Sequence, residues 1–560
     1  MQHRPWLARL LALLIGAALP LAFAPFDLWI IAPLSLAGLF LLWRDATPRE
    51  AGILGYTFGL GMFGVGTSWI FVSMHHFGEA IVPVAGLITL VFAAIMAIFP
   101  ALAGGLAARL APAKSLIRLL LAMPLAWMLL ELIRGEFLGG FPWLNLGASQ
   151  IASPLAGLGP VLGEYGMSLA VVLSAAWLLG LLQIPPAPLL QRGVKDTRTS
   201  ALEADTAPLF QRGVEDTRTS ALEADTPPFF QRGGENTSTG TKTPRVFFVL
   251  GSALPLIALW TGGSALQRMV WVEAAGAPIS TAIVQGNVEQ SRKFDPAVFQ
   301  ATLELYRDLT ASQAADARLV VWPETAVPDT VEQAAPFLIE MQDAARARGQ
   351  SIVAGVFDQD KKGNYYNALL ALPVQGGRYY KRHLVPFGEY LPLRFLIEPF
   401  RGLIQVPMSD LSSGSENQAL LQLAGHSAGA SICYEATLAR KINTALPEAA
   451  FLINASNDAW FGDSLAPHQH LQIAAMRSLE TGRWMVRATN TGISALINQH
   501  GEVVARTPQF EQAVLRGEIT PMQGATPFVI FGAWPVWILS VLGIFALGIA
   551  RYMTAERSRR

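Results

Sequence analysis

Residues 429–435 read Gly429-Ala430-Ser431-Ile432-Cys433-Tyr434-Glu435, a stretch typical of a strand in an α/β domain. Its small and apolar residues predict a short buried strand that ends at Cys433, the only cysteine of the chain. A buried cysteine is usually an inert packing residue. Small neighbours, however, let backbone or ligand approach the thiol closely, and strand ends are where α/β sheets place reactive groups.

Similar short apolar runs lie on both sides of this stretch and alternate with helical patterns. The predicted strands are Ser280–Val288, Arg318–Trp322, Ser351–Phe357, Tyr366–Leu372, Gly429–Cys433 and Phe451–Asn454, and the predicted helices cover 296–314, 332–348 and 466–483. Strand-like runs at 485–498 and 502–507 close the domain. This alternation predicts an α/β domain with a buried sheet over residues 277–520.

Two further ionisable residues follow predicted strands upstream of Cys433. Glu324 comes directly after an apolar strand and Pro323, at an edge where desolvation raises a carboxyl pKa toward the range of a general base. Lys381 lies between aromatic residues, where a cation can stabilise a developing oxyanion. Taken alone, each also fits an ordinary surface residue. Their joint order is more specific, because a lysine favours a thiolate and a glutamate can accept its proton.

These three positions resemble the catalytic triad of the nitrilase, or carbon–nitrogen hydrolase, superfamily. Glu324 stands in WPE, Lys381 in YYKRHLVPFGEYLP and Cys433 in ICYE. Over nearly its whole length the sequence is similar to the apolipoprotein N-acyltransferases, the membrane-embedded members of that superfamily. The stretches that carry this similarity are LAFAPFDLW (21–29), FPWLNLGASQ (141–150), VQGNVEQSRKFDP (284–296), NASNDAWFGDS (454–464) and HQHLQIAAMRSLETGRWMVRATNTGIS (468–494).

The resemblance implies a polytopic α-helical membrane domain of about eight helices and a nitrilase-like αββα sandwich outside the membrane. It implies ping-pong transfer of the sn-1 acyl chain of a phospholipid, such as phosphatidylethanolamine, through a thioester on Cys433. The acceptor would be the α-amino group of the N-terminal S-diacylglyceryl-cysteine of a lipoprotein. Glu324 would be the proton acceptor, and Lys381 with the backbone amide of Tyr434 would stabilise the oxyanion. The implied partners are therefore phospholipid, diacylated apolipoprotein and bilayer, with no cofactor, metal or nucleic acid.

Several neighbouring residues are candidates for supporting roles. Glu389, eight residues after Lys381, is expected to orient that lysine or assist proton transfer, or else to form a structural ion pair. Glu435 is a candidate for a similar part. Four aromatic residues either line the pocket or pack in the core: Trp322, Phe387, Tyr390 and Tyr434. His468 and His470 lack a cysteine partner and make a poor metal site.

The composition of the whole chain is poor in charge. Its 560 residues carry 41 Lys+Arg and 41 Asp+Glu, and charged residues make up 15%, where about 25% is usual for soluble domains. This composition excludes a disordered chain, a disulfide scaffold and a nucleic-acid binder led by net basic charge. It indicates a membrane protein.

Eight apolar segments are candidate membrane spans, since a bilayer core requires about 20 apolar residues in a helix. They cover about 7–23, 26–43, 51–72, 81–108, 117–133, 163–183, 246–262 and 528–550. Residues 1–183 are therefore predicted to form a six-span bundle, followed by a seventh span at 246–262 and an eighth at 528–550. The first segment also imitates a cleavable signal peptide.

Lysine and arginine predict the orientation of these spans. With the N-terminus in the cytoplasm, the basic residues of the short connecting segments fall on the cytoplasmic side, and Arg134 alone lies outside. This places both termini in the cytoplasm. The domain at 277–520 then lies on the other side, which the resemblance makes the periplasmic face of a bacterial inner membrane.

Two polar or amphipathic segments interrupt this plan. Residues 184–245 contain a 20-residue repeat, with Gln191–Thr206 recurring from Gln211, and predict a flexible cytoplasmic insert. Residues 384–408 are unusually apolar for an external loop and include Phe395 and two arginines. That mixture predicts a membrane-facing loop at the headgroup boundary, or a hydrophobic lid over the core.

Two other functions are compatible with the same residues. A membrane-anchored nitrilase-type amidase uses the same triad, but water takes the acyl group in place of an amine. A transporter or assembly protein with an external binding module predicts that Cys433→Ser leaves function intact, and it expects charged residues inside the spans. The few charged residues of the spans lie mostly at their predicted ends: Asp27, Glu50, Glu131 and Glu164.

Overall fold

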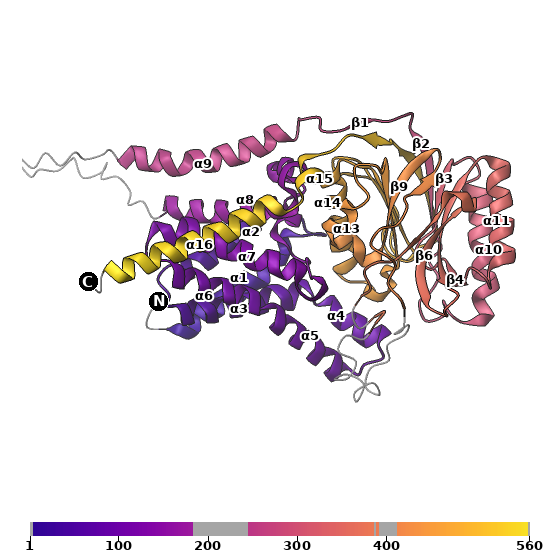
Figure 1. The fold of residues 1–560 in the computed structure, drawn as a ribbon. Helices are drawn as coiled ribbons and strands as arrows, with labels where there is room; N and C mark the ends of the chain where they lie inside the picture. Colours follow the sequence, from indigo (N-terminus) through magenta and orange to yellow (C-terminus); the bar gives the residue numbers. More distant parts are fainter. Residues whose placement is uncertain (1–3, 183–244, 386–387, 391–410, 558–560) are drawn as a thin grey trace, which may run out of the picture.

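The computed structural model describes residues 4–182, 245–385, 388–390 and 411–557. A bundle of apolar helices lies beside a domain built of two packed sheets (Figure 1). The predicted repeat-bearing insert at 184–245 lies outside the described residues except for its last residue, Arg245.

Every predicted span contains helix. The helices of the bundle are α1 (Pro5–Ala18), α2 (Ile31–Trp43), α3 (Pro48–Gly66), α4 (Trp69–Val72), α5 (Val82–Met96), α6 (Ile98–Leu110), α7 (Met123–Glu136), α8 (Gly159–Leu182), α9 (Arg245–Leu266), α15 (Pro527–Phe531) and α16 (Trp534–Arg557). Helices α2 and α5 contain no charged residue, in keeping with the low charge of the composition.

By length and composition alone, fewer than eight helices are long and apolar enough to cross a membrane. In the described part of the chain four stretches qualify, namely Pro5–Ala22, Val82–Leu110, Pro154–Leu181 and Trp534–Arg557. A fifth is added if Pro48–Gly66 and Trp69–Phe77, which meet at 50°, count as one. The predicted spans at 26–43 and 246–262 correspond to shorter apolar helices, Ile31–Trp43 and Ala253–Leu266. The count of eight is therefore not confirmed.

Glycine lets the first helices of the bundle approach closely. A Cβ at Gly16 of α1 would lie 2.1 Å from the Phe58 carbonyl oxygen of α3. Reciprocally, a Cβ at Gly61 of α3 would lie 2.2 Å from the Leu13 carbonyl oxygen of α1. Such small-residue contacts are how helices pack in membranes, where no hydrophobic force drives them together.

The second domain contains two sheets. Its strands are β1 (Glu273–Ala274), β2 (Ile279–Gln285), β3 (Leu319–Val321), β4 (Val327–Thr330), β5 (Ser351–Gln359), β6 (Tyr365–Leu372), β7 (Arg378–Tyr380), β8 (Leu421–Leu423), β9 (His426–Ile432), β10 (Phe451–Ser456), β11 (Met485–Thr489), β12 (Ala495–Ile497), β13 (Val503–Arg506), β14 (Ala513–Ile519) and β15 (Met522–Gln523). One sheet has the order β14-β2-β3-β5-β6-β7 with β4 beside β5, and the other β13-β12-β11-β10-β9-β8. In the first, β2, β3 and β5 are parallel, and in the second, β9, β10 and β11 are parallel.

The two sheets pack face to face, and helices cover their outer faces. Val321 of one sheet and Ile432 of the other belong to the same buried core between them. On the outer face of the first sheet lie α10 (Pro296–Gln313) and α11 (Ala335–Arg348), and on that of the second lie α13 (Ala439–Asn443) and α14 (Ala466–Thr481) (Figure 1). This is the αββα sandwich that the resemblance implied, and it agrees with the α/β domain predicted from the alternation of strands and helices.

Helix α14 joins the sandwich to the bundle. All of its residues except His468 are buried, because it lies between the second sheet and the membrane helices. Arg477 of α14 pairs with Glu164 of α8 at 2.6 Å, and Gln469 accepts a hydrogen bond of 2.6 Å from the indole of Trp143. Buried polar contacts of this kind hold the two domains in one fixed relation.

Candidate active site

The structure brings the three predicted residues together where strands of both sheets end. Glu324 follows β3, Lys381 follows β7 and Cys433 follows β9. The Lys381 Nζ lies 3.4 Å from Glu324 Oε1 and 2.7 Å from Glu389 Oε1. Cys433 is close enough for the charges of Glu324 and Lys381 to act on its thiol. Glu389, the predicted supporting residue, thus contacts Lys381 directly.

The backbone turns sharply at the two strand ends that carry Glu324 and Cys433. Cys433 has φ +52° and Thr325 has φ +53°, in the left-handed region that non-glycine residues rarely adopt. Gly355 of β5 makes room for the first turn, because a Cβ there would lie 2.2 Å from the Pro323 carbonyl oxygen. Such backbone persists only where the surrounding structure enforces it, and it is concentrated at active sites.

Hydrogen bonds leave one oxygen of Glu324 free to take a proton. Its Oε1 accepts from Asn367 Nδ2 at 2.7 Å and from Lys381 Nζ at 3.4 Å. Within the described part of the chain, its Oε2 accepts no hydrogen bond. Glu389 is bound through both oxygens, because Oε1 accepts from Lys381 and Oε2 accepts from the Val385 amide at 2.8 Å. Glu324 is therefore the better placed of the two carboxylates to accept a proton.

Sequence reasoning missed two buried polar residues at this site. Asn367 of β6 reaches both carboxylates, at 2.7 Å from Glu324 and 3.4 Å from Glu389. Lys293 donates to the Glu324 carbonyl oxygen at 3.0 Å, and burial lowers the pKa of its ammonium to about 8. An amide inside the apolar run Tyr365–Leu372 was a signal for the first. Lys293 carried no such local signal.

Glu435 holds the loop after Lys381 against the cysteine strand. Its Oε1 accepts from the Arg382 amide at 2.7 Å and the His383 amide at 3.0 Å. Its Oε2 accepts from the Tyr379 hydroxyl and from the Ile432 amide, each at 2.8 Å. With four donors on a fully buried carboxylate, Glu435 braces the site and has no oxygen directed to Cys433.

The aromatic residues predicted to line the pocket lie in different places. Trp322 packs in the core, which is the second of the two alternatives predicted for it. Its side chain is fully buried in the core between the first sheet and its helices, and its indole donates to Thr310 at 3.1 Å. Tyr390 is half-buried. Phe387, Phe395 and most of the predicted membrane-facing loop at 384–408 lie outside the described residues.

Comparisons with known proteins cover the whole chain. Residues 15–177 match the family model described as the apolipoprotein N-acyltransferase N-terminal domain, and residues 280–527 match the carbon-nitrogen hydrolase model. An apolipoprotein N-acyltransferase of Methylococcus capsulatus is 41% identical over 99% of this chain and 97% of its own length. One of Azotobacter vinelandii is 41% identical over 96% of this chain and 94% of its own length. The chain belongs to the apolipoprotein N-acyltransferase family.

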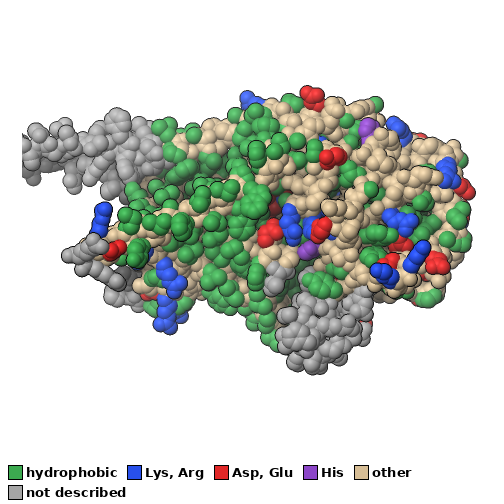
Figure 2. Space-filling model, viewed as in Figure 1, with side chains coloured by type: hydrophobic (Ala, Val, Ile, Leu, Met, Phe, Trp, Pro, Cys, Tyr) green, Lys and Arg blue, Asp and Glu red, His purple; other side chains and the backbone are tan. Residues whose placement is uncertain are grey.

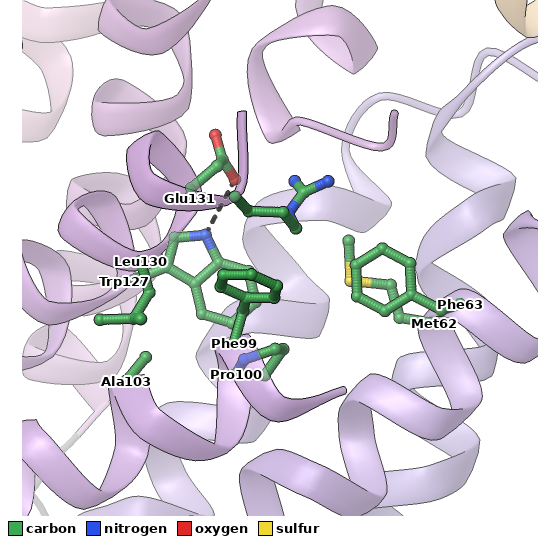
Figure 3. Close-up of a pocket in the computed structure, with 9 residues that line it drawn as sticks. Met62, Phe63, Phe99, Pro100, Ala103, Trp127, Leu130 and Glu131 are labelled. Carbon is green, nitrogen blue, oxygen red and sulfur yellow. Dashed lines mark hydrogen bonds between the residues drawn. The ribbon is translucent and has the colours of Figure 1, made fainter. Parts of the chain in front are cut away.

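The helical bundle contains buried polar residues and contacts the site through one of its loops. Figure 3 shows a small cavity between α3, α6 and α7, lined by apolar side chains and by Glu131, which accepts from the Trp127 indole at 3.1 Å. Arg134, one turn further along α7, donates to the carbonyl oxygens of Phe141 and Trp143 at 2.7 and 2.5 Å. The Tyr434 hydroxyl donates to the Gly140 carbonyl oxygen at 2.9 Å. The residue after the nucleophile is thus attached to the loop that Arg134 holds.

The surface of the helical bundle differs in composition from the surface of the sandwich. Hydrophobic side chains cover the face of the bundle in view, whereas charged side chains are spread over the sandwich and gather at the junction (Figure 2). Large side chains such as Leu87, Leu90 and Phe545 are more than half exposed on the bundle. A contiguous apolar surface of this size indicates contact with lipid.

Burial and charge set the resting protonation of the site. Burial and the Glu324 charge raise the pKa of the Cys433 thiol to about 12, although Lys381 opposes them. Burial disfavours the Lys381 ammonium, but Glu324 and Glu389 outweigh it and raise the pKa of that lysine. At neutral pH the site therefore holds a thiol and a protonated lysine, and the nucleophile requires a base.

The raised pKa of the Cys433 thiol predicts how its rate of alkylation depends on pH. We expect the rate of Cys433 alkylation by iodoacetamide to rise by about tenfold per pH unit from pH 7 to 9.5 without a plateau, since a thiol that titrates near pH 12 gains thiolate throughout that window. Intact mass measures the adduct, and the absence of any second cysteine makes the readout unambiguous. A plateau below pH 8 would show instead that Lys381 holds a resting thiolate.

Proposed function

We propose that this protein is an apolipoprotein N-acyltransferase that carries the acyl group on Cys433. It takes the sn-1 acyl chain of a phosphatidylethanolamine-type phospholipid and delivers it to the α-amino group of an N-terminal S-diacylglyceryl-cysteine. The observation that carries the proposal is the cluster of buried Glu324 and Lys381 with the half-buried Cys433, in a chain 41% identical to a named member of the family over almost its full length.

The first half-reaction forms a thioester. Glu324 Oε2 takes the thiol proton, and Cys433 Sγ attacks the ester carbonyl carbon of the phospholipid. The tetrahedral oxyanion then collapses, its carbon–oxygen bond breaks, and Glu324 returns the proton to the leaving glycerol oxygen. A lysophospholipid departs and the acyl group stays on Cys433. General base catalysis of this kind contributes about 10²–10⁴-fold in rate.

The second half-reaction forms the amide. The lipoprotein amine attacks the thioester carbonyl carbon, and Glu324 accepts a proton from the attacking nitrogen. The carbon–sulfur bond breaks, and that proton passes to the departing Cys433 sulfur. The triacylated product leaves and the thiol is restored. No cofactor or metal takes part in this scheme, and every proton that Glu324 accepts is returned within the same half-reaction.

Lys381 and the Tyr434 amide stabilise the oxyanion in both halves. Lys381 is a fixed cation, held by Glu324 on one side and Glu389 on the other. Tyr434 lies in the first turn of the 3₁₀ helix Cys433–Thr437, where amides have no partner within the helix. Donors fixed in a site with little water stabilise developing charge without reorganisation, and each typically contributes about 3–4 kcal/mol.

Glu389 orients Lys381 in this scheme, and Glu324 alone acts as the base. We therefore expect Glu324→Gln to slow Cys433 acylation by at least about 100-fold, whereas Glu389→Gln, which keeps a hydrogen-bond acceptor, slows it by about tenfold. Samples quenched at successive times and measured by intact mass give the acylation rates of both variants. Glu416→Gln is the matched control, because Glu416 pairs with Lys441 away from the triad. Equal losses in the two triad variants would mean that Glu389 shares the proton transfer.

The arrangement in the membrane is part of the proposal. The helices of residues 1–183, the seventh span at 246–262 and the eighth at 528–550 would cross a bacterial inner membrane, with both termini and the 184–245 insert in the cytoplasm. The catalytic domain, about residues 277–520, would lie on the periplasmic side. The uneven distribution of Lys and Arg and the apolar surface of the bundle support this arrangement.

The overall reaction is tested with a labelled donor. The purified protein in phospholipid vesicles receives phosphatidylethanolamine labelled in the sn-1 chain and a synthetic S-diacylglyceryl-cysteinyl peptide. We expect the label in an amide of the peptide, by tandem mass spectrometry, and equimolar lysophospholipid. Label that appears only as free fatty acid would overturn the proposal in favour of a membrane-anchored hydrolase.

A further inference from the structure

A buried polar cluster lies directly behind the nucleophile and has no part in the scheme above. Its members are His470 of α14, Asn454 of β10, Asp458 and Arg487 of β11, and each is at most 2% exposed. The His470 Nε2 lies 3.2 Å from the Cys433 carbonyl oxygen, and the Asn454 Nδ2 lies 3.4 Å from the same oxygen. A carbonyl oxygen only accepts, so Asn454 donates to it, and His470 donates to it in the tautomer that carries the ring proton on Nε2 and accepts at Nδ1 from Arg487.

The rest of the cluster fixes these two donors. The other ring nitrogen of His470, Nδ1, lies 3.0 Å from Asp458 Oδ1 and 3.0 Å from Arg487 Nη2. Arg487 pairs with Asp458 at 2.7 Å and donates to the amide oxygen of Asn454. Ser456 donates to Asp458 at 2.7 Å. Every member is thus oriented by another member.

The carbonyl that this cluster holds belongs to the peptide that supplies the oxyanion donor. In a trans peptide the C=O of one residue and the N–H of the next point in opposite directions across one plane. Fixing the Cys433 carbonyl toward His470 and Asn454 therefore fixes the Tyr434 N–H toward the opposite side, where the substrate carbonyl reacts. Cys433 also has φ +52°, a conformation that needs external support.

We propose that His470 and Asn454 are positioning residues of the oxyanion site, which hold the Cys433–Tyr434 peptide so that its N–H faces the developing oxyanion. This inference rests on the proposed acyl transfer through Cys433. Hydrogen bonds to the carbonyl also polarise the same peptide and strengthen its N–H as a donor.

Packing alone does not explain a cluster of this composition. Buried polar and charged groups cost free energy unless every one is satisfied, and apolar side chains often fill such a space with equal or better stability. The aromatic rings of Trp143 and Phe461 lie against the His470 ring, with centroids 5.7 and 6.1 Å away. Trp143 belongs to the loop held by Arg134, so the membrane bundle helps to orient the imidazole.

Two reactions of the Cys433 thiol distinguish a role of His470 in positioning the oxyanion donor from a role in the stability of the fold. Acylation by phospholipid passes through an oxyanion, whereas alkylation by iodoacetamide displaces iodide and forms none. We expect His470→Phe, which keeps a ring but removes the donor, to slow acylation at saturating phospholipid by about tenfold to 100-fold. Its alkylation rate should remain within about twofold of wild type. His470→Gln, which restores an N–H donor, should recover part of the acylation rate.

Two more variants complete the test. Asn454→Leu removes the second donor from another element, and we expect the same split between acylation and alkylation. His468→Phe is the matched control, because His468 lies on the same helix but outside the cluster, and it should leave both rates unchanged.

The outcomes are distinct. Unchanged acylation in both cluster variants would overturn the inference, and so would an alkylation rate that changes together with acylation, which is the result expected of a merely structural role or of unfolding. A wild-type protein that forms no acyl adduct would overturn the proposed function itself, whereas normal wild-type acylation with normal His470→Phe acylation overturns this inference alone.

Discussion

Cys433→Ala is expected to abolish acyl transfer while leaving the protein folded. The chain has no other cysteine, so no second thiol can take the acyl group. Alanine is small enough for the tightly turned strand end, and it leaves no unpaired polar group there. We therefore expect activity below about 0.1% of wild type, with a thermal midpoint within a few degrees, because large effects on stability require a cavity or an unsatisfied group.

The variant is measured in proteoliposomes by transfer of labelled acyl chains to a diacylated peptide, with thermal unfolding in the same detergent as the check on folding. Cys433→Ser is a second, isosteric variant, and we expect it to lose transfer as well, since an alcohol in this site has a far higher pKa than the thiol. Transfer by Cys433→Ala at more than a few per cent of the wild-type rate would mean that the amine attacks the phospholipid directly.

Lys381→Met is expected to have the second largest effect, on both activity and stability. The substitution keeps the length of the side chain but removes a cation that two buried carboxylates share, at 2.7 and 3.4 Å. Breaking a buried ion pair on one side costs about 3–5 kcal/mol, part of which is relieved when one carboxylate takes a proton. The loss of an oxyanion donor adds about 10²–10³-fold in rate.

Lys441→Met is the control for the loss of a lysine as such. Lys441 is itself buried, but its partner Glu416 has a side chain that is 65% exposed, so the carboxylate left unpaired by the substitution stays solvated by water and the cost is small. Lys381→Arg is expected to fail as well, because a planar guanidinium does not replace a compact ammonium between two fixed carboxylates. If Lys381→Met retained more than a tenth of wild-type activity, Lys381 would not be a donor to the oxyanion.

Local sequence was sufficient for two of the three strands that place the triad, whereas β7, the strand before Lys381, was not among the predicted strands. The runs around Glu324 and Cys433 are apolar, short and followed by turns, and both form strands as predicted. Strand β14 was not predicted, because this edge strand is only partly buried and its polar residues resemble a loop. The count of eight spans is not confirmed, in part because the segment predicted at 26–43 forms a helix of only 13 residues, Ile31–Trp43.

Glu389 and Glu435 were predicted as supporting residues, but the places of other residues around the site could not be predicted, because they depend on contacts between distant parts of the chain. Trp322 and Glu324 are two residues apart, as on one face of a strand, but β3 ends at Val321 and the two side chains separate. His470 was considered only as half of a metal pair with His468, yet it donates to the backbone of a residue 37 positions away. Asn367 lies 43 positions from Glu324.

The most direct measurement of the central claim is a pulse and chase on the wild-type protein. The protein is incubated with phosphatidylethanolamine, freed of lipid and measured by intact mass, and then mixed with the diacylated peptide. The expected result is one added acyl mass, absent in Cys433→Ala and removed by hydroxylamine, that moves to the peptide amine during the chase. An acyl mass that stays on the protein while the peptide is acylated from fresh phospholipid would contradict the account.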